Sequence, residues 1–271
     1  MEKRTEFFEA LQAMEALELR DRLAFVNAMA GLKPGCGAGS YPLADGWLVD
    51  GGSEAPHLSV LIGTGAGKAL SEPELDQVEA FFNGRQRTAR AWVTHGINDT
   101  LREQLLAHGW EVEEEHPLCL YLLKRGETFP LPPDGVTVGP VNGEELQTYL
   151  QAAACCWLGI EHAEPDQLLI GKAFSANPGT TAILARVEGT PAATAMVSVE
   201  GDCAVFHGGC TLPGFRRRGV QAALIHERLR YAHEMGCRWA WVAGVKNGPT
   251  QRNAERLGFV REGFREVLIK T

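Results

Sequence analysis

The stretch "FRRRGVQAAL" at residues 215–224 places three arginines and a glycine immediately before a predicted helix. A helix start leaves backbone N–H groups unpaired and carries the positive end of the helix dipole. Gly219 has no Cβ, so an anion can approach the backbone closely, while Arg216, Arg217 and Arg218 add positive charge around it. The stretch predicts a pyrophosphate-sized anion site. The alternative is that the arginines only solvate a turn.

The chain as a whole is acidic, so this run of arginines is a local basic feature. The chain has 26 basic against 34 acidic residues and a net charge of −8, which argues against binding nucleic acid or anionic membranes. No stretch reaches the roughly 18 apolar residues of a membrane span, and the start lacks a signal peptide core. Seven cysteines, an odd number without metal-ligand spacing, indicate a reducing compartment and small apolar roles. We expect a cytoplasmic protein without a metal site.

Strands and helices alternate around the quoted stretch, which predicts a mixed α/β sheet. The predicted strands are 136–139, 180–189, 192–201, 203–212, 238–245 and 264–270, and the predicted helices are 143–156, 165–173, 219–236 and 249–258. The first half alternates in the same way, with helices at about 4–30, 71–82 and 99–109 and strands at 57–63, 89–93 and 116–124. Residues 31–46 are glycine-rich and are predicted to form a loop. Residues 124–135 hold three prolines and two glycines and form the best candidate linker, so we expect domains 1–125 and 126–271.

The two halves resemble each other. A shift of 149 residues places 91–110 over 240–259 without a gap, with five identities and a shared order of strand, loop, helix and glycine. This pattern favours a duplicated fold over coincidence. The same shift places 67–72 over the arginine-glycine signature, with Leu70 at the position of Gly219 and no arginine, so the first copy is expected to lack the anion site. The glycines at 63–70 do not form a P-loop, because Ile62 and Ala69 break its pattern.

The arginine-glycine stretch resembles the signature of the GNAT superfamily of acyl-CoA-dependent N-acyltransferases. Its pattern, Gln/Arg-x-x-Gly-x-Gly/Ala, falls on Arg216, Gly219 and position 221, although Gln221 stands where the family has a small residue. The resemblance covers about 136–271 and implies the GNAT fold in a mixed α/β sheet. Together with the internal comparison, it implies two tandem copies after an N-terminal helix, of which 1–125 is degenerate and 126–271 catalytic.

The resemblance also implies a site for acetyl-CoA as co-substrate. In such proteins the fourth and fifth strands splay apart, the pantetheine arm lies between them, and an asparagine after the fifth strand often binds the arm. Carried over by position, the implied contacts are Gly209, Cys210, Thr211, Arg216, Arg217, Arg218, Gly219, Val220, Gln221, Ala222 and Asn247.

Acyl transfer to an amine needs a base and a donor for the oxyanion. The resemblance implies direct attack in a ternary complex, with a backbone N–H near Cys210 and Thr211 as the oxyanion donor. His207 is the candidate base, because its ordinary pKa suits neutral pH. It could equally be a histidine without a role. Glu200 and Asp202 are second candidates, or solvated turn residues.

The departing thiolate has no obvious acid. Ala254 stands where the superfamily has a tyrosine, so water, Thr250 or Asn253 would have to assist. Cys210 invites a covalent acyl-cysteine, but a small strand residue is the favoured interpretation because no partner base is evident.

The acceptor is expected to be the primary amine of a small molecule. His162 lies where the superfamily closes over its acceptor, and the nearby acids favour a cationic amine, although a charged surface loop explains them as well. Those acids are Glu161, Glu164 and Asp166. Two other functions stay open: an acyl-CoA-binding sensor without turnover, and a protein N-acetyltransferase. The sequence does not decide between a monomer and a homodimer.

Overall fold

The chain folds into two compact units, in a computed structural model that describes residues 2–65 and 68–271. Unit 1 comprises Met1–Leu118, Gly244–Gly248 and Glu262–Thr271, and unit 2 comprises Cys119–Ala243 and Pro249–Arg261. These units are defined by packing, and the functional division into 1–125 and 126–271 stays a prediction. None of the helices in the described ranges combines the length and apolar character of a membrane span.

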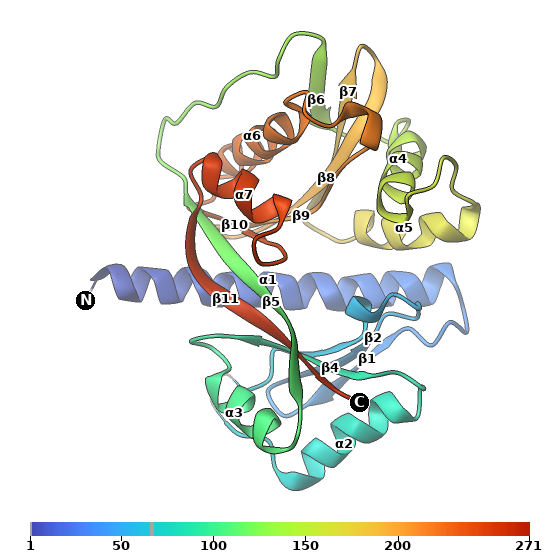
Figure 1. Ribbon diagram of the computed structural model, residues 1–271, viewed down its shortest axis with the longest axis vertical. Helices are drawn as coiled ribbons and strands as arrows, with labels where there is room; N and C mark the ends of the chain where they lie inside the picture. The colour runs from blue at the N-terminus through green and yellow to red at the C-terminus, as the bar shows by residue number, and fades with distance from the viewer. Residues whose placement is uncertain (1, 66–67) are drawn as a thin grey trace. The chain divides into compact units, whose positions relative to one another are not determined.

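Unit 1 contains a mixed sheet with helices from the N-terminal part of the chain (Figure 1). Its strands lie in the order β1 (Gly39–Leu43), β2 (Gly46–Asp50), β3 (Val60–Ile62), β4 (Ala89–Thr94), β11 (Val260–Lys270) and β5 (Glu111–Leu122). Two of these strands are divided between the units: β5 belongs to unit 1 up to Leu118, and β11 from Glu262 onward. Its helices are α1 (Glu2–Leu32), the 3-10 turn η1 (Pro56–Leu58), α2 (Glu72–Asn83) and α3 (Asp99–Ala107). The helix predicted at 4–30 is confirmed as α1.

The burial pattern of α1 explains why its residues form a helix. Leu11, Met14 and Leu17 are buried at helical spacing, and so are Phe25 and Met29 about two and three turns later. On the same helix, the carboxylates of Glu15 and Glu18 both pair with the buried guanidinium of Arg265 in β11. The charged and apolar residues that alternate in the sequence therefore serve one packed helix face.

The first strand contradicts the prediction of a loop across 31–46. Gly39 to Leu43 pair antiparallel with β2, from Gly39 opposite Asp50 to Leu43 opposite Gly46. The stretch reads as a loop because it is rich in glycine and contains Pro42, which cannot donate to a neighbouring strand. An edge strand tolerates proline, and β1 lies at the end of the strand order. The interpretations of 63–70 and 67–72 include residues 66–67, which lie outside the described residues.

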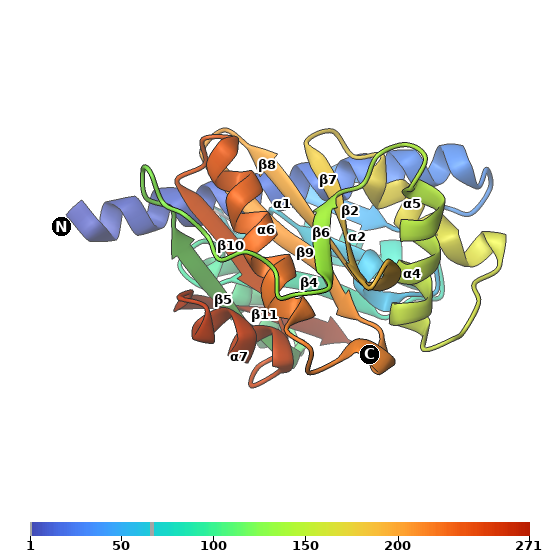
Figure 2. The same ribbon diagram turned by 90° about the horizontal axis from the view of Figure 1, so that it is seen from above.

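Unit 2 contains a second group of strands in mixed orientation, covered by helices on both faces (Figures 1 and 2). Its strands lie in the order β10 (Trp239–Ala243), β9 (Cys203–Thr211), β8 (Thr190–Glu200), β7 (Thr180–Val187) and β6 (Val136–Pro140), with the last residues of β5 beside β10. Its helices are α4 (Leu146–Leu158), α5 (Leu169–Ser175), α6 (Val220–Glu234) and α7 (Pro249–Arg256), with 3-10 turns η2 (Pro165–Leu168) and η3 (Pro213–Phe215).

Alternation along β8 assigns the helices to the two faces of this sheet. Ala195 and Val197 share a core with Leu224 of α6, whereas Met196 between them packs with Tyr149 of α4. Ala254 of α7 belongs to the α6 core. One face of the sheet is therefore covered by α6 and α7, and the other by α4 and α5. The mixed α/β architecture predicted from the sequence is confirmed.

Candidate functional site

The central feature of unit 2 is the separation of two parallel strands. β10 pairs with β9 from Trp239 opposite Cys203 to Val242 opposite Phe206. β9 then continues from His207 to Thr211, while β10 ends at Ala243. Beyond Phe206, the backbone groups of β9 that face away from β8 have no strand partner in β10. The strands diverge, as the predicted place of a pantetheine arm requires.

A β-bulge lies at the point of divergence. Met196 of β8 stands opposite His207, and Thr194 stands opposite Cys210, so two steps along β8 match three along β9. Gly208 takes a left-handed conformation with φ of 64°, which suits glycine because it has no Cβ. The extra residue changes which side chains of β9 face each helix layer.

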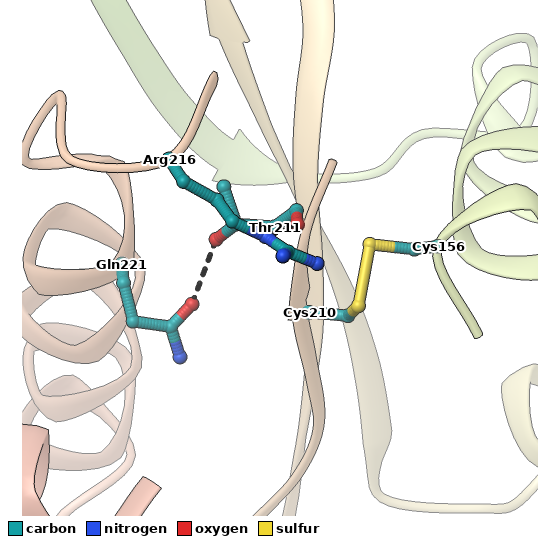
Figure 3. The surroundings of a disulfide bond; sticks show 5 residues. All are labelled: Cys156, Cys210, Thr211, Arg216 and Gln221. Atoms are coloured by element: carbon teal, nitrogen blue, oxygen red, sulfur yellow. Dashed lines mark hydrogen bonds between the residues drawn. A yellow bond between two sulfur atoms is a disulfide. The ribbon is translucent and has the colours of Figure 1, made fainter. Parts of the chain in front are cut away.

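After the bulge, successive residues of β9 are fixed to opposite layers (Figure 3). Cys210 forms a disulfide with Cys156 of α4, with 6.1 Å between the two Cα atoms. The hydroxyl of Thr211 donates to Oε1 of Gln221 in α6 at 2.9 Å. The diverging end of β9 is thus tied to α4 on one side and to α6 on the other.

The disulfide corrects the interpretation of the cysteines. The prediction that all of them are small apolar residues outside any disulfide is wrong for Cys156 and Cys210, which lie 54 residues apart in the sequence. The sequence pattern gave no sign of a contact over that separation. Because Cys210 holds no free thiol in this structure, it is not an acyl-cysteine nucleophile. The odd cysteine count also no longer supports a reducing compartment.

The start of α6 is open. Gly219 caps the helix with φ of 76° and ψ of −4°, no side chain caps it, and the first turn contains no acidic residue. Arg216, Arg217 and Arg218 are all exposed. The Nε of Arg216 donates to the carbonyl oxygen of Thr211 at 3.3 Å, which holds the turn to the end of β9. The positive end of the helix and the arginines therefore face solvent together.

The local geometry fits the diphosphate of a coenzyme A molecule. A Cβ at position 219 would lie 3.0 Å from Cγ of Pro133, so a side chain there would both strain the backbone and crowd the turn. Val220 is buried in the core, so only its backbone N–H is available to a ligand. Backbone N–H groups at a helix start are good phosphate donors. The predicted residues 216–222 are brought together by the structure.

Asn247 lies in the segment Gly244–Gly248, which belongs to unit 1. It takes a left-handed conformation with φ of 57°, which asparagine tolerates better than most residues. Its predicted contact with the cofactor arm stays a prediction.

His207 faces the α4 and α5 layer. Its Nε2 lies 2.7 Å from Oγ of buried Ser198 in β8, and that oxygen lies 2.7 Å from Oγ1 of Thr180. The ring centroid lies 6.1 Å from that of Phe174 in α5. His207 is half-buried beside the bulge, at the beginning of the diverging part of β9. The hydrogen bond between the Ser198 hydroxyl and this ring nitrogen fixes the orientation of the imidazole, a useful arrangement for a base.

The second candidate bases lie at the wrong end of β9. The carbonyl oxygen of Asp202 accepts hydrogen bonds from the backbone N–H groups of Arg238 and Trp239, at 2.8 and 3.0 Å. This turn precedes the paired end of β9. At about 3.3 Å per strand residue, Asp202 is about 23 Å from Gly209 along the strand. Asp202 and Glu200 therefore shape a turn and do not reach the diverging end.

No acid stands at the position expected for the leaving group. Ala254 is buried in the core beneath α7, with 1% of its surface exposed. The neighbouring Asn253 accepts a hydrogen bond from Nη2 of Arg256 at 3.1 Å, so it is engaged along its own helix.

A pocket of about 680 Å³ opens on the α4 side of unit 2. Pro191 of β8 and Leu212 after β9 line one wall, which places the pocket next to the end of the diverging strand. The remaining lining residues are Gln147, Thr148, Gln151, Ala152, Cys155, Gly159, Ile160, Glu161, His162 and Pro213.

The pocket includes two of the residues predicted at the acceptor side. Glu161 and His162 line it, and His162 Nδ1 lies 3.2 Å from Nε2 of Gln151. Glu164 instead caps η2, where its N–H donates to Oε1 of Gln167 at 2.7 Å. Sequence reasoning missed the polar residues of α4, because Gln147 and Gln151 read as the solvent face of a helix.

Comparison with known proteins agrees with this geometry. Residues 146–259 match the model of the acetyltransferase (GNAT) family. These residues form a GNAT domain. The resemblance noted in the sequence is confirmed, and so is the GNAT fold class. No curated protein sequence matches the chain significantly.

Three solved structures of GNAT proteins share the fold. A GCN5-related N-acetyltransferase from Kribbella flavida matches with a TM-score of 0.65 and 22% identity, over 92% of this chain and 95% of that chain. A tandem GNAT protein from the clavulanic acid biosynthesis pathway matches with a TM-score of 0.60 and 16% identity, over 83% and 82%. A GCN5-related N-acetyltransferase from Sphaerobacter thermophilus has a TM-score of 0.60 and 14% identity, over 83% and 80%. At these identities the likeness concerns the fold alone.

Proposed function

We propose that the chain is an N-acetyltransferase that moves the acetyl group of acetyl-CoA to the primary amine of a small molecule, by direct attack in a ternary complex. One observation carries the proposal. β9 leaves β10 after Phe206, and the chain then leads through η3 to a helix start that combines Gly219 with three exposed arginines. A thioester supplies an activated acyl group, and the remaining tasks fall to the protein.

Each task has a candidate group in unit 2. The backbone N–H groups at Gly219 to Ala222 and the arginines before them hold the diphosphate. The free edge of β9, with Gly209, Cys210 and Thr211, aligns the arm. A backbone N–H near Cys210 polarises the carbonyl oxygen and stabilises the oxyanion. His207, oriented by Ser198 at 2.7 Å, accepts a proton from the amine.

The pocket supports a small acceptor. Its volume of about 680 Å³ lies in the range typical of small-molecule sites, roughly 300–1,000 Å³. Its acidic lining residue is Glu161, beside the polar side chains of Gln147, Thr148 and Gln151. One carboxylate among hydrogen-bonding groups favours a cationic amine, such as a polyamine, over an anionic substrate.

The test has two steps. Calorimetric titration with CoA establishes binding first, and release of free thiol from acetyl-CoA is then measured against polyamines, amino acids and aminoglycosides. We expect amine-dependent thiol release above the rate without amine. A protein that does not bind CoA would overturn the proposal.

The sensor function is the second candidate because Ala254 provides no acid for the departing thiolate. A protein that binds CoA, yet releases no thiol with any amine or peptide offered, would support this function. Acetylation of peptides but not of small amines would instead favour a protein N-acetyltransferase.

A further inference from the structure

Arg228 is a buried cation outside the groups assigned to the proposed reaction. It lies on α6, and only 2% of its surface is exposed. Its Nε donates to the carbonyl oxygen of Leu224 at 3.1 Å, and its guanidinium carbon lies 4.7 Å from the ring centroid of Phe206. These contacts hold the guanidinium in place but supply no counter-charge.

No carboxylate of the described chain pairs with this guanidinium. Burial lowers the pKa of Arg228 to about 9, and Tyr149 of α4 is the titratable group that partly offsets this shift. In contrast, buried Arg265 of unit 1 pairs with both Glu15 and Glu18. A buried cation without a partner is costly. Such a group is expected where a ligand supplies the missing negative charge.

The unpaired donors converge on one point of β9. A Cβ at Gly209 would lie 3.6 Å from Nη2 of Arg228 and 3.7 Å from Nη1. The same point lies 3.4 Å from Nε2 of Gln221. Because Oε1 of Gln221 accepts from Thr211, the amide group turns its N–H donors toward Gly209. Three donor nitrogens therefore lie around the backbone of Gly209, which has no side chain.

This point lies at the inner end of the space between the separating strands. Phe206, beneath the guanidinium, is the last residue of β9 that pairs with β10. Gly209 follows within the bulge, on the face covered by α6. An arm that enters at Gly219 and follows β9 toward Phe206 brings its sulfur to this inner end. The donors therefore lie on the α6 side of the reacting thioester, opposite His207 and the α4 layer.

We propose that Arg228, assisted by Gln221, stabilises the thiolate that leaves during acyl transfer. This inference rests on the proposed function. The amine nitrogen forms a bond to the carbonyl carbon, and its proton passes to His207. The carbon–sulfur bond then breaks, and both of its electrons stay on sulfur. The guanidinium neutralises the thiolate until it takes a proton from water.

The first test measures the thiol of bound CoA, independently of turnover. Thiolate absorbs in the ultraviolet, so its titration can be followed in the complex. We expect the pKa of the bound thiol to lie at least about one unit below that of free CoA titrated under the same conditions. In Arg228→Met it should return to that value or rise, and Arg228→Lys should fall between. An unchanged pKa in Arg228→Met would overturn the inference.

The second test separates catalysis from structure. Methionine fills similar volume without charge, so Arg228→Met should unfold at the same temperature or higher. It should bind desulfo-CoA as well as the wild type does, but kcat should fall about 100-fold. Guanidinium ions should restore part of the activity of Arg228→Ala. A kcat within about threefold of wild type in Arg228→Met would contradict the proposed role.

Controls keep the outcomes distinct. Arg230 lies on the same helix and pairs with Glu227, so Arg230→Met should change neither the thiol pKa nor kcat. A wild-type protein that does not bind CoA defeats the proposed function itself. A protein that binds CoA with an ordinary thiol pKa defeats only the role of Arg228. If Arg228→Met lost activity with succinyl-CoA but not with acetyl-CoA, the anion would be an acyl carboxylate, and the thiolate assignment would be wrong.

Discussion

Each unit contains a helix that starts shortly after a strand, and the two helix starts differ in what occupies them. In unit 1, the carboxylate of Glu74 accepts hydrogen bonds from the backbone N–H and the hydroxyl of Ser71, both at 2.7 Å. Glu72 adds a second acid in the first turn of α2. In unit 2, Gly219 leaves the start of α6 without a side-chain cap or an acid.

The contrast shows that a helix start alone does not make an anion site. The chain's own carboxylates already satisfy α2, and Gln104 holds the backbone of Leu70 just before it with two hydrogen bonds. At the start of α6 the backbone N–H groups remain available, and three arginines make the local electrostatic potential more positive. The difference lies in a few residues around one turn, which supports the proposal that unit 2 alone holds the cofactor.

The largest effect should come from closing the open helix start. Gly219→Glu should abolish CoA binding in calorimetric titration, because it places a carboxylate and its bulk where the diphosphate is proposed to lie. The backbone of Gly219 has φ of 76°, so any side chain adds strain of roughly 1–2 kcal/mol.

Gly219→Ala is the matched control for that strain. It should weaken binding only about tenfold if the loss in Gly219→Glu comes from charge and bulk. Lys68→Glu, near the start of α2, should leave CoA affinity unchanged. Retained affinity in Gly219→Glu would overturn the site assignment.

Replacing His207 separates chemistry from binding within unit 2. His207→Ala should lower kcat about 100-fold without changing the affinity for CoA. A base acts when it is neutral, so the deficit should be largest above the pKa of the histidine and should shrink at acid pH. The acidic limb of the rate profile should disappear in the variant. A variant with the same pH profile as wild type would remove His207 from the mechanism.

Removing the charge of the arginines before α6 should weaken CoA binding by an intermediate amount. Substitution of Arg216, Arg217 and Arg218 by glutamine should lower CoA affinity about 10- to 100-fold, because charge-assisted hydrogen bonds are lost. The remaining binding should depend less on salt concentration than that of wild type. Arg85→Gln in unit 1 is the control, since that guanidinium already pairs with Asp50. Equal loss of affinity in both variants would mean that the effect is not local.

The disulfide should give unit 2 a sensitivity to reductant that unit 1 lacks. Loss of a cross-link that spans 54 residues should destabilise unit 2 by about 2–4 kcal/mol. Calorimetry with dithiothreitol, or on Cys156→Ser, should show a lower unfolding temperature for one transition only. Cys36→Ser changes a free thiol of unit 1 and should have little effect. A transition of unit 2 that ignores both reductant and Cys156→Ser would argue against a stabilising disulfide.

The smallest effect concerns the capped helix of unit 1. Hydrogen bonds from the backbone and side chain of Ser71 lower the pKa of Glu74. A lowered carboxyl pKa adds stability above the unfolded pKa, and this stability is lost as the pH falls through the folded value. Glu74→Gln should lower the unfolding temperature slightly at pH 7, and the difference should shrink as the pH falls below the ordinary glutamate pKa and vanish below the lowered folded one. CoA affinity should not change, since Leu70 and the absence of arginines still distinguish this start.

The parts of the site that could be predicted from sequence depend on neighbours along the chain. The arginines, Gly219 and the helix after them lie within a few residues, and their backbone donors follow from helix geometry. The separation of β9 from β10 was available only through resemblance to a family. The edge strand β1 was missed because Pro42 and several glycines match a loop, and only its position at the end of the sheet makes them acceptable.

The features that sequence reasoning missed depend on distant contacts. Nothing near Cys156 indicates that Cys210 will face it, because the bulge at Gly208 decides which side of β9 that residue takes. Sequence reasoning did not single out Arg228, because an arginine on a helix is mostly exposed. Its spacing of four residues from buried Leu224 is the signal that could have placed it on the inner face.

A crystal structure of the protein with CoA tests the central claim most directly. We expect density for the diphosphate at the backbone of Gly219 to Ala222, with the arm along Thr211 to His207 and the sulfur near Gly209. The start of α2 should carry no ligand. Diphosphate density at the start of α2, or an arm that lies outside the space beside β9, would contradict the account.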